Sequence, residues 1–238
     1  MKNLVIACTA FLLVFSACKR DQYYKDGGTA QANYPGNMME YLNSKSVPFD
    51  TLTQIIKLAG LEQTFTKEEF TFFAPSDEII RRTIGNINTD GLNNYLYYAG
   101  KDTVKTLSNI DSLIWKKYLQ RCMFQGVNRL KDYSQVDFNV ITIYPGALYY
   151  SYSGSVFNIG VEYGDANGIK YMGYRQLALT YIPDVSRPTE NWTTNLISSS
   201  DIKPVNGVVH TLVSNNSFLG FAKYEFFDEI KNAGLKYK

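Results

Sequence analysis

Two stretches in the first half of the chain carry apolar residues at helical spacing. Asp50 is a good N-cap residue, and the apolar positions that follow it share one helical face. These positions are Leu52, Ile55, Ile56 and Ala59. In the second stretch the apolar positions recur every four residues, at Ile110, Ile114, Tyr118 and Cys122. We therefore predict amphipathic helices over residues 49–60 and 111–122.

A short run between these helices has the composition of a buried strand. Residues 70–74 are almost entirely apolar, and Pro75 follows them directly. Ser76 can cap a helix there, and Asp77 and Glu78 would lie favourably at the positive end of that helix. The pattern predicts a strand that turns abruptly into a helix.

The second half of the chain is dominated by strand-like runs. Residues 136–142 alternate between apolar and polar types, which is the period of a half-buried strand. Further runs of this kind cover residues 147–152, 156–163, 169–182 and 207–213. Residues 186–200 have the composition of a loop, and residues 224–238 form a tail with a short helix near 226–233. Because helices precede strands, we predict an α+β fold with an antiparallel sheet.

The N-terminus has the pattern of an export signal. Lys2 precedes an apolar or small run, Leu4 to Ala17, which is shorter than the roughly 20 residues that span a bilayer. Residues 18–37 are polar and contain glycines, which predicts a flexible tether. We therefore divide the chain into a signal peptide over 1–17, this tether, a domain over 38–223 and the tail.

The cysteines and the charge balance narrow the class of protein. Cys8 lies in the signal and Cys18 at its end, so Cys122 has no partner within the mature domain. We expect Cys122 to be buried as a small apolar residue. Lys and Arg together number 24, against 22 for Asp and Glu. This near balance provides no electrostatic argument for nucleic-acid binding.

The sequence carries no familiar catalytic or metal-binding constellation. His210 is the single histidine, and with one mature cysteine it cannot form the usual zinc shell. A nucleophile elbow of the G-x-S-x-G type is missing as well. We therefore expect a protein that is not an enzyme and that uses no metal or cofactor. Since His210 lies among apolar residues, we interpret it as a hydrogen-bonded core histidine, with a ligand or proton-switch role as the alternative.

Tyrosine is unusually frequent, with 19 residues in the chain. Those in the hairpin-like half are Tyr144, Tyr149, Tyr150, Tyr152, Tyr163, Tyr171, Tyr174 and Tyr181. Exposed tyrosines can stack on sugar rings or contact a peptide. The candidate ligand-binding residues are Tyr149, Tyr150, Tyr152, Tyr171 and Tyr174. The alternative is cross-strand aromatic packing.

The end of the signal resembles the lipobox of bacterial lipoproteins. Residues 15–18 read Phe-Ser-Ala-Cys, with small residues directly before the cysteine. The resemblance implies that Cys18 becomes the mature N-terminus and carries acyl chains such as palmitate, which hold the protein to a membrane. Residues 19–21, Lys-Arg-Asp, resemble surface-display signals of Bacteroidetes-like bacteria. Together these segments imply an outer-membrane lipoprotein that faces the cell surface or, alternatively, the periplasm.

Two further segments resemble the signatures of fasciclin-type (FAS1) domains. Residues 70–77 resemble the first signature, and residues 206–212, including the histidine, resemble the second. The residues that carry the two signatures are Phe73, Ala74, Pro75, Ser76, Asp77, Gly207, Val208 and His210. Where the family has a tyrosine-histidine pair, this chain has Phe124-Gln125.

The fasciclin resemblance extends over about residues 38–220 and implies a wedge-shaped β-sandwich with helices packed beside it. Thr71 and Gly207 are 136 positions apart (207 − 71), more than is usual in the family, which implies a hairpin-rich insertion over about 131–200. The family also implies an adhesion or interaction role without catalytic residues or cofactor. We expect a membrane-anchored surface lipoprotein that binds a protein, peptide or glycan. The alternative is an accessory subunit of a TonB-dependent outer-membrane nutrient importer of the starch-utilisation type.

Overall fold

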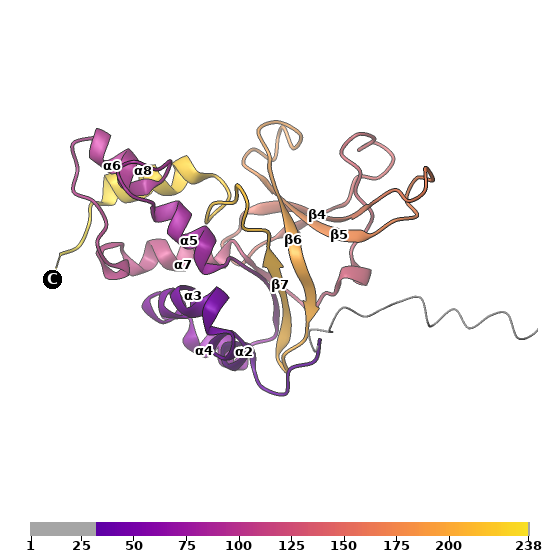
Figure 1. Ribbon diagram of the computed structural model, residues 1–238, viewed down its shortest axis with the longest axis horizontal. Coiled ribbons are helices and arrows are strands. Elements are labelled where there is room, and N and C mark those ends of the chain that lie inside the picture. Colours follow the sequence, from indigo (N-terminus) through magenta and orange to yellow (C-terminus); the bar gives the residue numbers. More distant parts are fainter. Residues whose placement is uncertain (1–31, 238) are drawn as a thin grey trace, which may run out of the picture. The chain divides into compact units, whose positions relative to one another are not determined.

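The computed structural model describes residues 32–237. The predicted signal peptide, Cys18 and the first part of the predicted tether lie outside the described residues. Figure 1 shows helices gathered on one side of the described unit and long strands on the other. This arrangement confirms the predicted α+β class, in which helices pack beside a sheet.

The described strands form one seven-stranded sheet in the order β2-β1-β7-β6-β5-β4-β3. The strands are β1 (Phe70–Ala74), β2 (Met123–Gln125), β3 (Ala147–Tyr150), β4 (Val156–Tyr163), β5 (Arg175–Ile182), β6 (Thr193–Ile202) and β7 (Gly207–Leu212). β1 and β7 are parallel, and the other neighbouring strands are antiparallel. The sheet predicted to be antiparallel is therefore mixed, with one parallel pair. Three helices and the whole hairpin region separate β1 from β7 in sequence, and a connection of that length permits parallel pairing.

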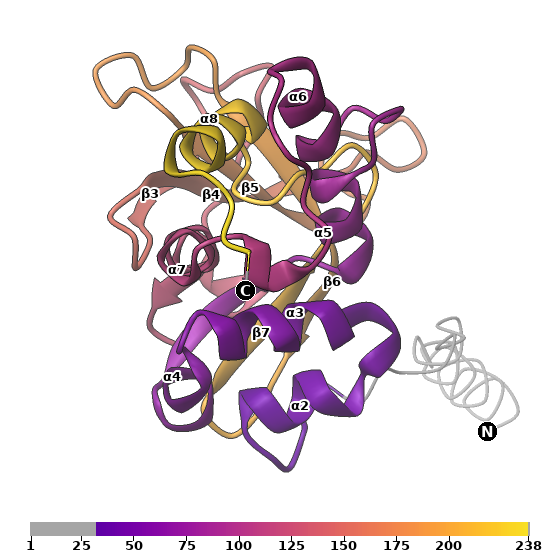
Figure 2. The ribbon, with the colours of Figure 1, turned by 90° about the vertical axis from the view of Figure 1, so that its left-hand side faces the viewer.

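The helices form a layer beside the sheet. They are α2 (Met38–Ser44), α3 (Ser46–Leu58), α4 (Glu62–Lys67), α5 (Asp77–Ile84), α6 (Leu92–Tyr98), α7 (Ser112–Gln120) and α8 (Lys223–Ala233), with short 3-10 turns η2 (Leu107–Asn109) and η3 (Leu130–Asp132). Figure 2 shows α2, α3 and α4 as one group and α6 beside α8 as another, with α5 and α7 between them.

The two edges of the sheet meet each other. Phe124 of β2 forms an isolated bridge with Ser151, just beyond β3. Next to it, the backbone N–H of Tyr152 donates to the carbonyl of Met123 at 2.8 Å. The sheet therefore curves back on itself, and the predicted sandwich takes the form of one sheet closed by this contact.

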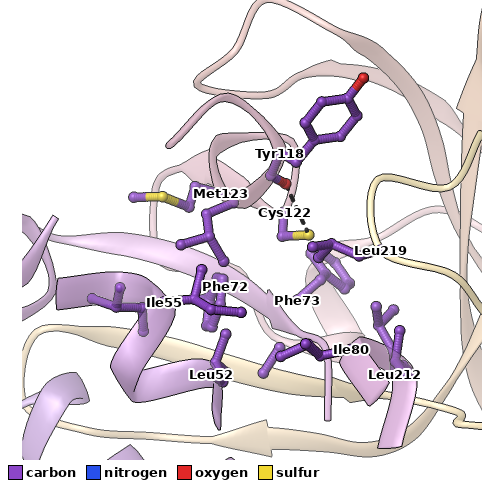
Figure 3. Packing of buried hydrophobic residues seen from close by; sticks show 14 of the residues in the cluster. Leu52, Ile55, Phe72, Phe73, Ile80, Tyr118, Cys122, Met123, Leu212 and Leu219 are labelled. Atoms are coloured by element: carbon purple, nitrogen blue, oxygen red, sulfur yellow. Dashed lines mark hydrogen bonds between the residues drawn. The ribbon is translucent and has the colours of Figure 1, made fainter. Parts of the chain in front are cut away.

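Strand β1 lies at the centre of the apolar core. All five of its residues are buried, although alternate side chains of a strand point to opposite faces. Phe72 packs edge-on against Phe65 of α4, with ring centroids 4.9 Å apart, and Phe73 packs against Phe124 of β2 at 5.4 Å. In Figure 3, Phe72 and Phe73 belong to one cluster with side chains of α3, α5 and α7. The burial of both faces explains why this strand is apolar without alternation.

The start of β7 is fastened to the helical layer by Asn206. Its side-chain oxygen accepts from the N–H of Met38 at 2.7 Å, and its amide nitrogen donates to the carbonyls of Phe65 and Glu68 at 3.1 and 3.0 Å. The next residue, Gly207, approaches β1 so closely that an added Cβ would lie 2.2 Å from the carbonyl oxygen of Phe70. These contacts explain the Asn-Gly pair before β7 in structural terms.

The helix starts differ in part from the prediction. Helix α3 begins at Ser46, so Asp50 lies inside the helix, where its carboxylate accepts from the amide of Gln54 at 3.1 Å. The earlier start is possible because Pro48 falls in the first turn, where its missing N–H costs nothing. Asp111 caps α7 through the N–H of Leu113, as residues of its type do.

Two regions of the hairpin half were predicted wrongly. Residues 136–142 form turns instead of a strand, because the Asp137 carboxylate accepts from the N–H of Asn139 at 2.9 Å and bends the chain. Residues 186–200 were predicted to form a loop, but residues 193–202 form β6. Two register shifts against β7 break the period of two in this strand, which hides it from pattern reading.

Both ends of the described unit take part in its packing. The N–H of Tyr34 donates to the carbonyl of Lys203 at 2.9 Å, within the segment expected to be a tether. Helix α8 places Phe226, Phe227 and Ile230 in the core, within the segment expected to be a tail. The compact unit therefore includes residues on both sides of the predicted domain boundaries.

Candidate functional site

His210 of the second signature lies fully buried on β7. Its Nε2 donates to the carbonyl of Asn128 at 3.0 Å, and its Nδ1 accepts from the N–H of Asp201 at 3.2 Å. Burial lowers the pKa of His210 from 6.5 to about 4, against smaller opposing effects of the Asn128 bond and the Asp201 charge. The geometry is that of a neutral core histidine, the first of the two interpretations.

The other signature residues also have structural roles. Phe73, Ala74, Pro75 and Val208 are buried in or beside β1 and β7. Ser76 occupies the N-cap position of α5 without a capping bond, and its Oγ lies 2.8 Å from the Oγ of Ser214. The Asp77 carboxylate accepts from the N–H of Leu52 at 3.0 Å and so ties α5 to α3.

Phe124, at the position of the family's tyrosine, packs between Phe73 and Phe157, each at 5.4 Å. Gln125, at the position of the histidine, is exposed on the short strand β2. Cys122 is buried, as predicted, and burial raises the pKa of its thiol to about 12. Phe124 and Cys122 are enclosed in the core and do not face a ligand.

The predicted tyrosines fall into two groups at opposite ends of β4. Tyr150 pairs with Val156 at the start of β4, whereas Tyr171 and Tyr174 belong to the connection that follows Tyr163 at its end. The set therefore does not form one surface.

In the first group, packing is the main role. Tyr149 points inward against Tyr133, with ring centroids 5.5 Å apart, and Tyr152 packs near Phe70 at 5.9 Å. Tyr150 is the exposed member of this group. Cross-strand and core packing, the alternative interpretation, accounts for Tyr149 and Tyr152.

In the second group, Tyr171 but not Tyr174 lines a cavity of about 450 Å³, which we call the tip cavity. It is lined by the turn 136–140, by Glu162 and Tyr163 at the end of β4, and by Asp165, Lys170 and Tyr171 of the β4–β5 connection. Pairing of β4 with β5 holds the connection in place, and the backbone N–H of Val136 donates to the carbonyl of Val161 at 2.9 Å. Three separate segments thus form the walls.

Tyr171 is the most constrained residue of the tip cavity. Its φ of 62° lies in the left-handed region, which is unfavourable for a residue with a bulky side chain. Its hydroxyl donates to Asp137 at 2.9 Å, its backbone N–H donates to Asp165 at 2.9 Å, and its ring meets Tyr144 edge-on at 5.2 Å. These contacts from both sides fix the ring as a wall of the cavity.

The charges of the tip cavity are mainly negative. Hydrogen bonds, first that from the N–H of Asn139, lower the pKa of Asp137. Burial, and then the charge of Asp137, raise the pKa of Glu162. Within residues 32–237, no ion pair involves Asp137, Glu162 or Asp165.

Two larger hollows flank helix α5, with volumes of about 660 and 850 Å³. Several of the polar groups that line them are already bonded within the protein. Ser76 meets Ser214, Asp77 binds the N–H of Leu52, and Arg82 binds Glu78 and the carbonyl of Ser214. The tip cavity differs in its number of such groups: three carboxylates line it, and none of them has an ion pair within residues 32–237. It is therefore the candidate functional site.

Sequence reasoning found Tyr171 but missed Asp137, Glu162 and Lys170. Asp137 looked like the polar position of a strand, and Glu162 like one of many exposed acids. The bridge of Gln135 with Val161 sets Asp137 beside Glu162, and Lys170 belongs to the connection that follows β4. In the described part of the chain, no group of three or more His, Cys, Asp or Glu is arranged to hold a metal ion. No helix within residues 32–237 is both long and apolar enough to cross a membrane.

Comparison with known proteins gives a likeness in fold. No protein-family model matches the chain, and no curated protein matches it in sequence. Among solved structures, it is similar to a FAS1 domain pair from the insect cell adhesion molecule fasciclin I. The two share 16% identity with a TM-score of 0.48, over 75% of this chain and 50% of that chain. The chain thus spans about half the length of that domain pair.

Proposed function

We propose that this chain is a non-enzymatic lipoprotein of the outer membrane that holds a protein, peptide or glycan partner at the tip cavity. The lipobox-like residues 15–18 support an acyl anchor on Cys18, and the fasciclin-like signatures support an adhesion or interaction role. The observation that carries the binding role is the bracing of Tyr171 by Asp137 and Asp165. A strained conformation held by several contacts is common where a protein preforms a site.

The anchor is tested by the Cys18→Ala substitution. We expect the variant to leave the membrane fraction on carbonate washing, while the Cys8→Ala control stays membrane-bound, because Cys8 lies within the signal. Retention of the Cys18→Ala protein after washing contradicts the anchor.

The binding role is tested by a pull-down from the native membrane in gentle detergent. We compare the wild-type protein with Tyr171→Gly, which removes the wall but keeps a backbone that tolerates positive φ. Tyr98→Ala, an exposed tyrosine on α6, is the matched control. We expect recovery of a partner to fall about fivefold or more with Tyr171→Gly alone. Equal recovery by all three proteins contradicts the role of the tip cavity, and recovery of a stoichiometric transporter identifies the partner as a nutrient importer.

A further inference from the structure

We infer that the tip cavity receives the basic side chain, lysine or arginine, of a partner peptide whose neighbouring residues are apolar. The inference rests on the proposed function, because it names the class of partner for the same cavity.

The lining of the tip cavity carries more negative than positive groups. Asp137, Glu162 and Asp165 face a single lining cation, Lys170. Asp137 accepts a hydrogen bond from the hydroxyl of Tyr171, and Asp165 accepts one from its backbone N–H. Among the described residues, however, neither carboxylate has a positive partner. A guanidinium or ammonium group entering the cavity would supply the missing charge.

Glu162 of β4 is half-buried. Within residues 32–237 its carboxylate makes no hydrogen bond and no ion pair. A partly desolvated carboxylate beside a second one, Asp137, is stabilised by a nearby cation more strongly than an exposed carboxylate would be. The cavity therefore favours a positively charged guest over a neutral one.

The aromatic rings are poorly placed to stack on a sugar. The guanidinium of Arg175 covers the ring of Tyr163, at 3.6 Å from its centroid. The ring of Tyr171 is fixed edge-on to Tyr144. Arg175 thus covers one face of Tyr163, and the hydroxyl of Tyr171 is already bonded to Asp137. The lining therefore acts through its carboxylates more than through stacking, which favours a peptide over a glycan.

Exposed apolar residues adjoin the acidic lining, and we call them the apolar rim. Its members are Ile143, Ile169, Met172 and Tyr174, exposed by 65%, 59%, 67% and 67%. Ile169 and Met172 adjoin the lining residues Lys170 and Tyr171 in sequence, and the ring of Tyr174 lies over Gly164 next to Tyr163. A guest with a basic centre and apolar flanks matches this surface, whereas a free metal ion or a polar sugar leaves the rim uncovered.

The test uses four libraries of capped pentapeptides. The central residue is fixed as lysine, arginine, glutamine or glutamate, and the flanking positions carry mixed apolar residues. The libraries are passed over the immobilised protein in wild-type form and as Glu162→Gln, with Glu62→Gln on α4 as the matched carboxylate control. We expect retention of the lysine and arginine libraries to exceed that of the glutamine library about fivefold, and to be lost in Glu162→Gln but not in Glu62→Gln. Equal retention of the four libraries, retention of none, or retention unchanged in Glu162→Gln overturns the inference.

The native pull-down separates this inference from the proposed function. If Tyr171→Gly and Glu162→Gln both lose the partner, both stand. If Tyr171→Gly alone loses it, the cavity binds a partner but not through a basic side chain, and the inference fails while the proposed function stands. If neither variant loses it, both fail.

Discussion

The Nδ1 atom of His210 accepts a hydrogen bond from the backbone N–H of Asp201 at 3.2 Å. Its other ring nitrogen faces the carbonyl of Asn128, so that nitrogen carries the proton. A second proton, on Nδ1, would point at the N–H of Asp201 and abolish that bond. Burial and this bond both keep the imidazole neutral.

We expect the free energy of unfolding to fall as the pH is lowered from about 6.5 to about 4. The pKa of His210 is about 4 in the folded chain and 6.5 as the ordinary value, so within this window only the unfolded chain takes up the proton. The shift corresponds to a loss of about 3 kcal/mol across the window. Urea unfolding of the wild type and of His210→Gln, followed from neutral to acidic pH, checks the prediction. We expect His210→Gln to be less stable than the wild type at neutral pH. Its free energy of unfolding should depend less on pH, because carboxylate contributions are common to both proteins. Parallel pH profiles of the two proteins would argue against the prediction.

A second prediction concerns the bonds of Asn206. Asn206→Ala leaves the N–H of Met38 and the carbonyls of Phe65 and Glu68 without their partner. We expect a loss of about 2–4 kcal/mol in the free energy of unfolding, since each buried group left unsatisfied costs about 1–3 kcal/mol. Chemical denaturation measures it, with Asn88→Ala in an exposed turn as control. A change for Asn206→Ala no larger than that for the control would show that the bonds are replaced by water.

The third prediction concerns the ion pair of Arg121 and Glu225, whose closest atoms are 2.6 Å apart. The guanidinium is buried between the rings of Tyr118 and Tyr181, at 4.6 and 4.8 Å from their centroids. Removing Glu225 leaves a buried charge without its partner, so Glu225→Ala should cost about 3 kcal/mol.

The control for this pair is Glu190→Ala. Its partner Arg187 is 60% exposed, so the change should cost below about 1 kcal/mol. Thermal and urea unfolding give both values, and a similar cost at the two sites would contradict the argument from burial. The double change Arg121→Met with Glu225→Gln should recover part of the loss, because no buried charge then remains.

The fourth prediction concerns the thiol of Cys122. Its burial and raised pKa leave little thiolate at neutral pH, so a disulfide reagent should label the folded protein slowly. In denaturant the same thiol should react at the rate of a free cysteine, at least about tenfold faster. Rapid labelling of the folded protein would show that the region around α7 and β2 opens readily.

The elements that the sequence predicts well are those with uninterrupted apolar runs between breakers. The predicted strands 70–74 and 207–213 match β1 and, to within one residue, β7, because strands buried on both faces need no alternation. Where polar residues bond to their own backbone, as Asp137 does to Asn139, the apparent period of two predicts a strand that does not form.

The candidate site was predictable only in part, for the same kind of reason. Tyr171 is visible in sequence as an aromatic residue of a turn-rich segment. Its bracing depends on Asp137 and Asp165, and the acidic lining depends on Glu162, which the bridge of Gln135 with Val161 sets beside Asp137. Such proximity is a property of strand pairing and leaves no local pattern in the sequence.

In the strand order, β7 lies between the pair β2-β1 and the block β6-β5-β4-β3, and it joins these two parts of the sheet. It pairs with β1 on one side and with β6 on the other. A chain made from its N-terminus therefore presents β1, an apolar strand with an open edge, until residues 207–212 arrive. During that interval the open edge of β1 can pair with other unfolded chains, so the pairing of β7 with β1 removes a route to aggregation.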